Sequence, residues 1–525
     1  MRLPRLLIVA FFVAIFTVSI FFTRYRIHAG AEAVEKWVLN NHEKLPQCSE
    51  DLAWLEPYNL AYPIQYASRD IIVNPVPGLE RASVTVVDSP LLNDFATVNL
   101  TESKLLHVPH CLPPLSLDVG HGSRSPADAS NLIFGLQTSI GRLRDTAKHL
   151  ARWLPHTNAQ LYAIVIEGDV DGVDIPAKDS EMEALQNEFR DQGMNVTIMH
   201  PVREEDRFQQ RYFSLIQVMY RARNANTQWV ATIDDDTFFP SLYSLQAMLS
   251  RFDPSKPHYI GSLSESWWAV NHYGLMGFGG ASIILSTPMA KIMDEHNDDC
   301  KNEPRTSAGD VTIMDCVYRF SSAKLENIPE LHQVDMHGDL SGFYESGREL
   351  LSLHHWKGSY SDYKVDMEKM HLVADICDNC FLQRWQFPED IVLTNGFSIV
   401  QYPEGRISGK KNGILGTGVG GGAKVEKINL ELVEETWDDD INVLHSLAPL
   451  RPKVGDDKKA YKLLDSFIVK DDDEPMGEIV RQVYIRQVEG EQPIVLVLNW
   501  QEARNQTASE TTPANEPSGV PTPPL

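Results

Sequence analysis

A triplet of carboxylates, Asp234–Asp236, stands between the apolar segment QWVATI (228–233) and the apolar pair Phe238–Phe239. Adjacent carboxylates repel one another, so burying such a cluster requires a compensating cation. Oxygen ligands of this kind bind Mg²⁺ or Mn²⁺, typically with phosphate oxygens in the same coordination shell. Two further Asp triplets, at 438–440 and 471–473, lie among other charged residues and are interpreted as solvated turns. The apolar flanks therefore make the first triplet the candidate metal site.

The segments before this triplet alternate between β-type and helical patterns. Expected strands lie at 82–88, 131–136, 160–168 and 194–200, and expected helices at 139–154, 179–190 and 206–222. Alternation at intervals of about 30 residues indicates a mostly parallel sheet with helices on both faces. Ligands of such sheets bind beyond the carboxyl ends of the strands, and the triplet falls at that position.

After about residue 385 the pattern changes to alternating strands with loops between them. The segments that indicate strands are 389–403, 424–432, 478–488 and 492–500. The Pro-, Ser- and Thr-rich segment 501–525 is predicted to be disordered. GTGVGG (416–421) matches the letters of a dinucleotide-binding fingerprint, but no strand precedes it and no helix follows it. We therefore interpret it as a flexible loop.

The N-terminal run Leu6–Phe22 is apolar or small throughout, with arginines on both sides. A helix of that length reaches about 26 Å, at the short end of a membrane span. A cleaved signal peptide is the alternative, because Ala29–Ala31 offers small residues at a cleavage site. The run is longer than the usual 7–15 residues of a signal core. We predict an uncleaved, single-pass anchor at 6–23 behind a short tail at 1–5.

Sequons at Asn99, Asn195 and Asn505 and an even number of cysteines favour a lumenal, oxidising location. The cysteines are Cys48, Cys111, Cys300, Cys316, Cys377 and Cys380. The pair Cys377 and Cys380 is expected to form a local disulfide or structural pair, since no second CxxC motif accompanies it. These features predict a glycosylated type II protein of the Golgi (or ER) membrane with its large domain in the lumen.

The formal net charge of −25, from 47 basic and 72 acidic residues, argues against nucleic acid as a partner. Polyanion binding depends on Lys and Arg side chains that neutralise phosphates. A nucleotide remains a compatible ligand, provided that a metal ion supplies local positive charge. The 525 residues suffice for one large domain with additions, or for two domains.

The segment 229–266 resembles the metal-binding strand region of the fringe-like glycosyltransferases of family 31, which are inverting enzymes of the GT-A fold. Four further segments follow in the order of that family: GFGGASIILS (277–286), GDVTIMDC (309–316), LHQVDMHGDLSGF (331–343) and LLSLHHW (350–356). The resemblance covers about 130–400 and is closest to a plant-type branch formerly catalogued as a domain of unknown function. Five motifs in one order are a more specific signal than any one of them.

The resemblance implies a ligand set for Mn²⁺ (or Mg²⁺). Asp236 would contact the ion directly, while Asp234 and Asp235 would orient its shell or hold the ribose of a UDP-sugar. His354 or His355 would complete the coordination, and the sequence does not distinguish between them. The ion would stabilise the diphosphate that leaves during sugar transfer.

Inverting transfer also needs a carboxylate that removes the proton of the acceptor hydroxyl, and the resemblance points to Asp310. The family motif usually has two acidic residues, whereas Gly309 precedes Asp310 here, so the assignment is uncertain by one residue. Asp310 as a cap of a helix near Val311 is the structural alternative. Cys300 and Cys316 flank this motif and are expected to be bonded.

Gly279 and Gly280 are expected to let the backbone approach the donor, because side chains there would collide with it. Arg142 and Arg144 are candidates to bind phosphate or uracil, with simple surface solvation as the alternative. The adjacent pair Trp267–Trp268 would form walls for an acceptor sugar ring or else belong to the core.

We therefore expect an α/β chain with a GT-A-like, Rossmann-type domain at 85–385, a stem at 24–84 and a β-rich extension at 386–500. The expected activity is inverting, metal-dependent transfer of a hexose or N-acetylhexosamine from a UDP-sugar to a glycan or glycoconjugate, with β-1,3 linkage by resemblance. A non-catalytic relative that binds nucleotide sugar or glycan is the alternative, which Gly309 keeps open. A metal-dependent hydrolase is a second alternative, but such enzymes commonly need two metals about 3.5–4 Å apart.

Overall fold

The computed structural model describes residues 48–92, 94–108, 111–120, 126–170, 173–302, 305–358, 363–407, 427–438, 446–455, 457–469 and 478–503. The predicted membrane span, the loop 416–421 and the tail 504–525 lie outside these residues. Within the described ranges, no helix is both long and apolar enough to cross a membrane. The chain divides into unit 1 (1–69, 92–114 and 487–495) and unit 2 (70–91, 115–486 and 496–525).

Unit 1 contains a short antiparallel pair of strands, β1 (Cys48–Asp51) and β5 (Leu105–Val108), and the 3-10 helix η1 (Ala53–Tyr58). Strand β4 (Ala96–Val98) pairs with the beginning of β2 (Ile64–Val76). The hydroxyl of Tyr66 donates a hydrogen bond of 2.8 Å to Glu50 Oε1, which joins β2 to β1.

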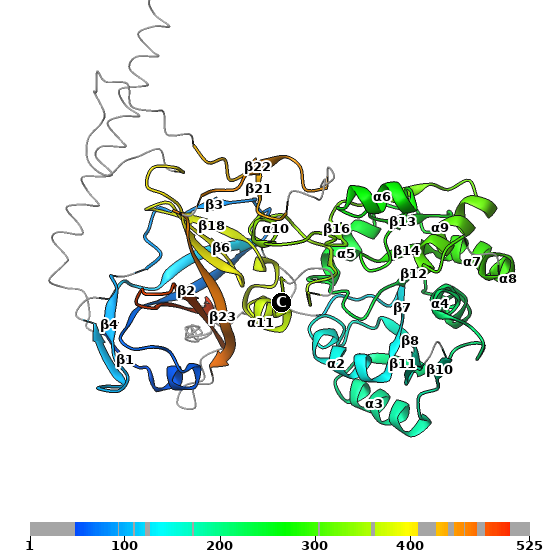
Figure 1. Cartoon of the computed structure of the whole chain (residues 1–525), viewed down its shortest axis with the longest axis horizontal. Coiled ribbons are helices and arrows are strands. Elements are labelled where there is room, and N and C mark those ends of the chain that lie inside the picture. Colours follow the sequence, from blue (N-terminus) through cyan, green and yellow to red (C-terminus); the bar gives the residue numbers. More distant parts are fainter. Residues whose placement is uncertain are drawn as a thin grey trace, which may run out of the picture. The chain divides into compact units, whose positions relative to one another are not determined.

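A seven-stranded sheet in unit 2 has the order β11-β8-β7-β12-β14-β13-β15 (Figure 1). Its strands are β7 (Leu132–Ser139), β8 (Gln160–Ile166), β11 (Asn195–Met199), β12 (Trp229–Thr232), β13 (Tyr259–Gly261), β14 (Ile283–Ser286) and β15 (Leu325–Asn327). The first four strands in this order are parallel, whereas β14 runs antiparallel to β12 and β13. The predicted α/β class with a mostly parallel sheet is confirmed.

Helices cover both faces of this sheet because its strands are apolar on both sides. Along β7, Phe134 and Leu136 enter a core shared with α2 and α3, whereas the preceding Ile133 enters a core shared with α4, α7 and α9. This alternation follows from the two-residue period of a strand. The bounds are α2 (Ile140–Leu150), α3 (Asp179–Asp191), α4 (Phe208–Ala222), α7 (Thr287–Glu295) and α9 (Gly309–Phe320).

Shorter elements connect these layers. They are β9 (Gly168–Val170), β10 (Val173–Ile175), α5 (Leu242–Leu249), α6 (Trp267–Tyr273), α8 (Asn297–Lys301), β16 (Leu331–His332), α10 (Ser341–Tyr344), β17 (Ser352–Leu353), α11 (Met367–His371), α12 (Ala374–Cys377), η2 (Asp378–Cys380), β21 (Val433–Glu435) and β22 (Leu450–Pro452). The parallel pair β16–β17 brings the segment before His354 alongside the segment 331–343.

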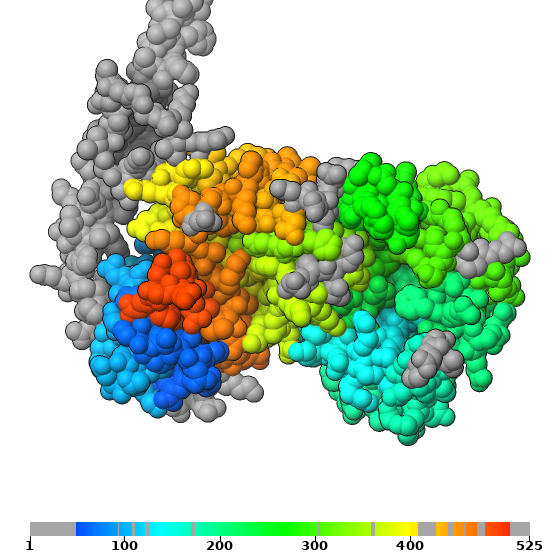
Figure 2. Space-filling view, viewed as in Figure 1, coloured from blue at the N-terminus to red at the C-terminus, as the bar shows by residue number. Residues whose placement is uncertain are grey.

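A second sheet in unit 2 has the order β3-β18-β19-β20-β23-β24-β25-β2, and β6 also pairs with β2. Its further strands are β3 (Thr85–Val86), β6 (Leu115–Gly120), β18 (Arg384–Phe387), β19 (Ile391–Thr394), β20 (Ser398–Gln401), β23 (Lys459–Val469), β24 (Ile479–Arg486) and β25 (Ile494–Glu502). In the space-filling view, the yellow β19–β20 region and the orange β23 region lie side by side (Figure 2). We call these strands the β-rich sheet.

The β-rich sheet differs from the sequence analysis in three places. β2 is a 13-residue strand within 24–84, the range that was assigned to a stem. The expected strand 82–88 shrinks to β3, because the carbonyl of Ser83 accepts a hydrogen bond from the Arg384 side chain instead of a strand amide. The expected strand 424–432 is wrong over 427–432, where the side chain of Asn429 accepts from the amide of Glu431 and closes a turn.

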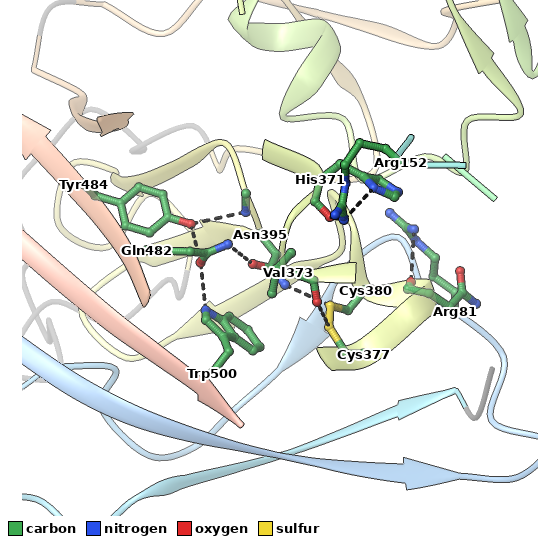
Figure 3. Close-up of a disulfide and its surroundings, with 12 residues drawn as sticks. Arg81, Arg152, His371, Val373, Cys377, Cys380, Asn395, Gln482, Tyr484 and Trp500 are labelled. Atoms are coloured by element: carbon green, nitrogen blue, oxygen red, sulfur yellow. Dashed lines mark hydrogen bonds between the residues drawn. A yellow bond between two sulfur atoms is a disulfide. The ribbon is translucent and has the colours of Figure 1, made fainter. Parts of the chain in front are cut away.

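Two predicted disulfides are present. Cys300–Cys316 joins α8 to α9, and Cys377–Cys380 closes the end of α12. Cys111 is also disulfide-bonded. Beside the second disulfide, buried polar side chains of β24, β25 and the β19–β20 turn pair with one another (Figure 3). The amide of Gln482 donates to Asn395 Oδ1 at 3.0 Å and its oxygen accepts from Tyr484 and Trp500, so these buried groups are satisfied.

An ion network joins the end of α10 to the β-rich sheet. The buried Glu345 lies 3.0 Å from Lys458 Nζ and 3.4 Å from Lys462 Nζ, and it accepts a 2.8 Å hydrogen bond from Ser398. Burial opposes ionisation of Glu345, but the two ammonium groups outweigh it and lower the pKa of this carboxyl to about 2.

Replacing Glu345 by Gln should lower the free energy of unfolding at neutral pH by about 3 kcal/mol. A carboxyl whose pKa is depressed in the folded protein stabilises the folded state at pH values above the ordinary pKa of that group. This contribution is lost as pH falls through about 4.5 towards about 2, so the difference from wild type should shrink between about pH 5 and about pH 3. Urea unfolding measures it, with the exposed Glu330→Gln as control. A difference that stays constant with pH would contradict the assignment.

Candidate active site

The carboxylate triplet begins where β12 leaves the sheet. All four residues of β12 are buried, and the amide of Ile233 extends the ladder by donating to Gly135 O at 2.9 Å. The chain then turns, with the amide of Asp234 donating to Thr237 Oγ1 at 2.9 Å. The Thr237 hydroxyl donates in turn to the carbonyl of Gly280 at 2.8 Å, which fixes the turn against the β14 side of the sheet.

A short bridge brings a histidine to the triplet. Phe238 and Leu353 exchange backbone hydrogen bonds of 2.8 and 2.9 Å, which place His354 next to the carboxylates. His354 Nε2 lies 2.9 Å from Asp236 Oδ1 and 3.4 Å from Asp234 Oδ2. His354 and Asp236 are buried, whereas the side chain of Asp234 is 38% exposed. We call these three side chains the Asp–His cluster.

The charges of the Asp–His cluster compensate one another. Burial opposes ionisation of Asp236, but the hydrogen bond and charge of His354 outweigh it and hold the pKa of Asp236 below its ordinary value. Burial likewise disfavours the imidazolium, yet its hydrogen bonds to Asp234 and Asp236 raise the pKa of His354 to about 10. Without a metal ion, the imidazolium of His354 therefore acts as the cation that the buried carboxylates require.

His355 faces a different carboxylate. Its Nδ1 lies 2.9 Å from Asp335 Oδ1, and the other oxygen of Asp335 accepts a 2.6 Å hydrogen bond from Ser264. The sequence left His354 and His355 equivalent, and the structure separates them, since His354 pairs with Asp234 and Asp236 whereas His355 pairs with Asp335.

The buried carboxylate behind this region was missed by the sequence analysis. Glu265 accepts from the amides of Val334 and Asp335 at 2.8 and 3.3 Å, and His332 Nδ1 lies 3.0 Å from it. Asp335 and His332 belong to the segment 331–343 that was singled out, but their partner Glu265 precedes the tryptophans by two residues and follows no spacing rule. These contacts hold the 331–335 strand region in register.

Asp235 is paired with Arg142, a residue predicted to contact the donor. Arg142 Nε and Nη2 donate to the two oxygens of Asp235 at 2.7 and 2.5 Å, and the hydroxyl of Thr138 donates to the same carboxylate. Asp235 is buried, whereas the Arg142 side chain is 68% exposed. Ser139, the N-cap of α2, places Arg142 in the first turn by accepting from its amide. Arg144 lies on the same helix and is exposed.

An open pocket of about 970 Å³ adjoins the carboxylates. Its basic lining residues are Arg142, Arg144, Lys148, Lys357 and Lys364, and its acidic ones are Asp145, Asp235 and Asp236. The ammonium of Lys357 donates to the carbonyl of Asp235 at 3.2 Å, so Lys357, three residues after His354 in the sequence, lies at the same site. In a chain of net charge −25, this basic pocket is suited to an anionic ligand.

The two glycines of the segment 277–286 seat side chains of the site. A Cβ at Gly280 would occupy the position of the His354 imidazole, and one at Gly279 would meet the hydroxyl of Tyr212. The sequence predicts that both glycines allow close approach of a donor. In the structure, Gly280 is required by His354 itself, and a role in donor binding stays a prediction.

Asp310 lies in the first turn of α9. Its carboxylate accepts from the amides of Val311 at 2.8 Å and Gly279 at 3.4 Å. The structural alternative, in which Asp310 caps a helix starting near Val311, is wrong, because α9 begins at Gly309 with Ala308 as its N-cap. Burial raises the pKa of Asp310 to about 6, with the charge of Asp234 adding to the effect and the two backbone amides opposing it.

The tryptophan pair is on the surface. Trp267 and Trp268 open α6 and are 46% and 62% exposed, and Trp268 stacks on His272 with ring centres 4.8 Å apart. The alternative that these residues belong to the core is therefore wrong, and their role with an acceptor stays a prediction.

Adding one methyl group at position 280 should displace His354, because the imidazole fills that space. We expect the NMR-titrated pKa of His354 in metal-free protein to fall from about 10 towards the ordinary value in Gly280→Ala. Gly141→Ala is the control, since a Cβ there meets nothing within 4 Å. An unchanged titration of His354 in Gly280→Ala would contradict this geometry.

Comparisons with known proteins place these residues in context. Residues 269–378, from α6 to the second disulfide, match a family described as "Protein of unknown function, DUF604". A search of curated protein sequences found no significant match. The fringe-like resemblance is not tested by these matches and stays a prediction.

Solved structures similar to this chain include several glycosyltransferases. The mannosyltransferase PcManGT from Pyrobaculum calidifontis, in complex with GDP-Man and Mn²⁺, is 11% identical with a TM-score of 0.26 over 39% of this chain and 57% of its own. Mouse xyloside xylosyltransferase 1 is 10% identical, with a TM-score of 0.27 over 39% of this chain and 86% of its own. GlyE from Streptococcus pneumoniae TIGR4 is 14% identical, with a TM-score of 0.24 over 37% of this chain and 44% of its own. This chain thus spans about half the length of the mannosyltransferase and of GlyE.

Proposed function

We propose that this protein is an inverting, metal-dependent glycosyltransferase that moves a hexose or N-acetylhexosamine from a UDP-sugar to a glycan acceptor with β-1,3 linkage. The observation that carries the proposal is the convergence of His354 on Asp234 and Asp236 at the carboxyl end of β12, beside a basic pocket. The uridine nucleotide, the inversion and the linkage rest on the resemblance of the five sequence segments.

The Asp–His cluster has the ligand types that a divalent ion prefers. Ligands at right angles around an octahedral ion, each about 2.1 Å from it, lie about 3.0 Å apart. The distances of 2.9 and 3.4 Å from His354 Nε2 to the two carboxylates bracket that value. Within the described ranges, no group of three or more His, Cys, Asp or Glu side chains is arranged so that it could hold a metal ion, so the Asp–His cluster would have to rearrange when an ion binds. Asp234, Asp236 and His354 would hold Mn²⁺ or Mg²⁺ in place of the His354 proton, and the ion would supply charge that stabilises a diphosphate leaving group.

The residues of the basic pocket would hold the rest of the donor. Asp235 and Thr138 orient the guanidinium of Arg142, so this cation is presented at the pocket in a defined direction. Lys357 is fixed by the carbonyl of Asp235 and by the hydroxyl of Thr146 at 3.1 Å. Preorganised cations of this kind stabilise phosphate oxygens without reorganising during the reaction.

Asp310 would act as the base for the acceptor hydroxyl. A carboxyl with a pKa of about 6 is mostly ionised at neutral pH, yet it is a stronger base than an ordinary aspartate. Its hydrogen bond to Gly279 connects it to the glycine pair that seats His354. Trp267 and Trp268 would offer apolar ring faces to the acceptor sugar.

We also propose a lumenal location in the Golgi (or ER), behind the apolar segment 6–22 as anchor. The disulfides Cys300–Cys316 and Cys377–Cys380 support an oxidising compartment. The sequon residue Asn195 is exposed on the edge strand β11, where a glycan would find room.

Mn²⁺ together with UDP or the correct UDP-sugar should raise the melting temperature, because a ligand at 100 times its Kd adds about 2.7 kcal/mol of stability. Replacing Asp236 by Asn should abolish this shift and lower Mn²⁺-dependent donor hydrolysis by more than about 100-fold. Asp191→Asn removes the same charge from the exposed end of α3 and is the control. No shift with any UDP-sugar or UDP would refute the donor assignment, while binding without hydrolysis or transfer would favour the non-catalytic alternative.

The transfer rate of the wild-type protein should fall about tenfold per pH unit below the pKa of Asp310, which is about 6, because the protonated carboxyl cannot accept the proton of the acceptor. Asp310→Asn should lower the transfer rate about 10²–10⁴-fold, and the fall of the rate at low pH should disappear in this variant. Donor binding, which the thermal shift with Mn²⁺ and UDP measures, should persist. Retained transfer in this variant would exclude Asp310 as the base.

A further inference from the structure

One tyrosine of α4 lies across both glycines that border Asp310. A Cβ at Gly279 would meet the hydroxyl of Tyr212, and a Cβ at Gly309 would lie 2.6 Å from the Cβ of the same tyrosine. The second contact cannot be relieved by rotating the Tyr212 side chain, because its Cβ is fixed by the backbone. Helices α4 and α9 therefore approach so closely at this point that position 309 accepts only glycine.

This approach explains why Gly309 stands where the resembling family has an acid. An acidic side chain at 309 would have to separate α4 from α9, and Val311 and Met219 belong to the core between these helices and the sheet. The glycine is thus a packing requirement of this chain. The ring of Tyr212 occupies the space beside Asp310 that a first acidic side chain would need.

Tyr212 is itself held in place from the strand side. It is 4% exposed, and its hydroxyl donates to Thr232 Oγ1, at the end of β12, at 3.2 Å. The ring is wedged between the backbones of Gly279 and Gly309 by its close approach to both. Asp310 follows Gly309 and accepts a hydrogen bond of 3.4 Å from the amide of Gly279, so this hydrogen bond joins the two backbones that the ring separates.

We propose that Tyr212 is a positioning residue that holds the carboxylate of Asp310 against the amide of Gly279 and keeps water from it. The inference rests on the proposed function in that Asp310 is taken as the base of the transfer. The titratable groups that act on Asp310 from the surrounding elements are Asp234 after β12, Tyr212 on α4 and Tyr259 on β13.

The test compares four variants by two measurements. Tyr212→Leu removes the ring, Gly309→Ala inserts a methyl group against the Cβ of Tyr212, and Tyr212→Phe keeps the ring but removes its hydrogen bond to Thr232. Tyr220→Leu is the control, because it removes a buried tyrosine from the same core two turns further along α4. The measurements are the carboxyl titration of Asp310 by ¹³C NMR, assigned with Asp310→Asn, and the pH profile of transfer.

In Tyr212→Leu and Gly309→Ala, the pKa of Asp310 should fall by at least about one unit as water reaches the carboxylate. Transfer at neutral pH should drop about 10- to 100-fold, since a small misplacement of a reacting group has effects of this size. The acid limb of the pH profile should move to lower pH in both. Tyr212→Phe and Tyr220→Leu should keep the wild-type titration and profile, even where Tyr220→Leu lowers the melting temperature.

An Asp310 titration unchanged in Gly309→Ala or Tyr212→Leu would overturn the inference, as would an equal shift in Tyr220→Leu. If Tyr212→Leu does not fold, Gly309→Ala decides alone. If the wild-type protein transfers no sugar, the proposed function fails, and the NMR titration still decides whether Tyr212 positions Asp310. The two failures are therefore distinguishable.

Discussion

Two carboxylates at the buried end of β12 need a positive charge within hydrogen-bonding distance, and much of the surrounding structure serves to supply it. The imidazole of His354 reaches Asp236 at 2.9 Å through the bridge between Phe238 and Leu353. Gly280 leaves the space for that ring, and Trp356 Nε1 donates to the carbonyl of Asp236 at 2.5 Å. Because a buried pair loses far more when one partner is removed than it gains from pairing, these supports are interdependent.

The β-rich sheet contributes to this arrangement through the chain segment that carries His354. That segment leaves α10 at Glu345, whose carboxylate is tied to Lys458 of the β-rich part of unit 2. It then meets the seven-stranded sheet, where the Ser352 hydroxyl donates to Ala281 O at 2.6 Å. A second tie runs between α11 and β23, with Lys369 Nζ 3.0 Å from Asp465. The β-rich strands therefore act as an anchor for the His354 segment, a role that neither their composition nor their pattern indicates.

The longer elements from β7 to β12 were predictable because each has a local period: two along the strands and 3.6 along α2, α3 and α4. The position of the triplet followed from the same rule. Contacts between segments far apart in the sequence were not predictable, since the local periodicity of apolar residues does not indicate which segments pack together. β2 was missed because its neighbours in the sheet include β25, more than 400 residues later. Likewise, His354 and His355 differ only in which carboxylate the tertiary fold places opposite each ring.

Gly309 shows how such a contact changes the interpretation of a motif. From the sequence, a glycine in place of an acid kept open the alternative of a relative that had lost its chemistry. In the structure, that glycine is required by the approach of α4, and the neighbouring Asp310 keeps a partly buried carboxylate with a raised pKa beside Gly279. Because packing requires the glycine at position 309, its presence does not indicate whether the remaining carboxylate, Asp310, can act as a base. The non-catalytic alternative therefore loses the residue that supported it, and what distinguishes the two functions is the state of Asp310 and of the Asp–His cluster.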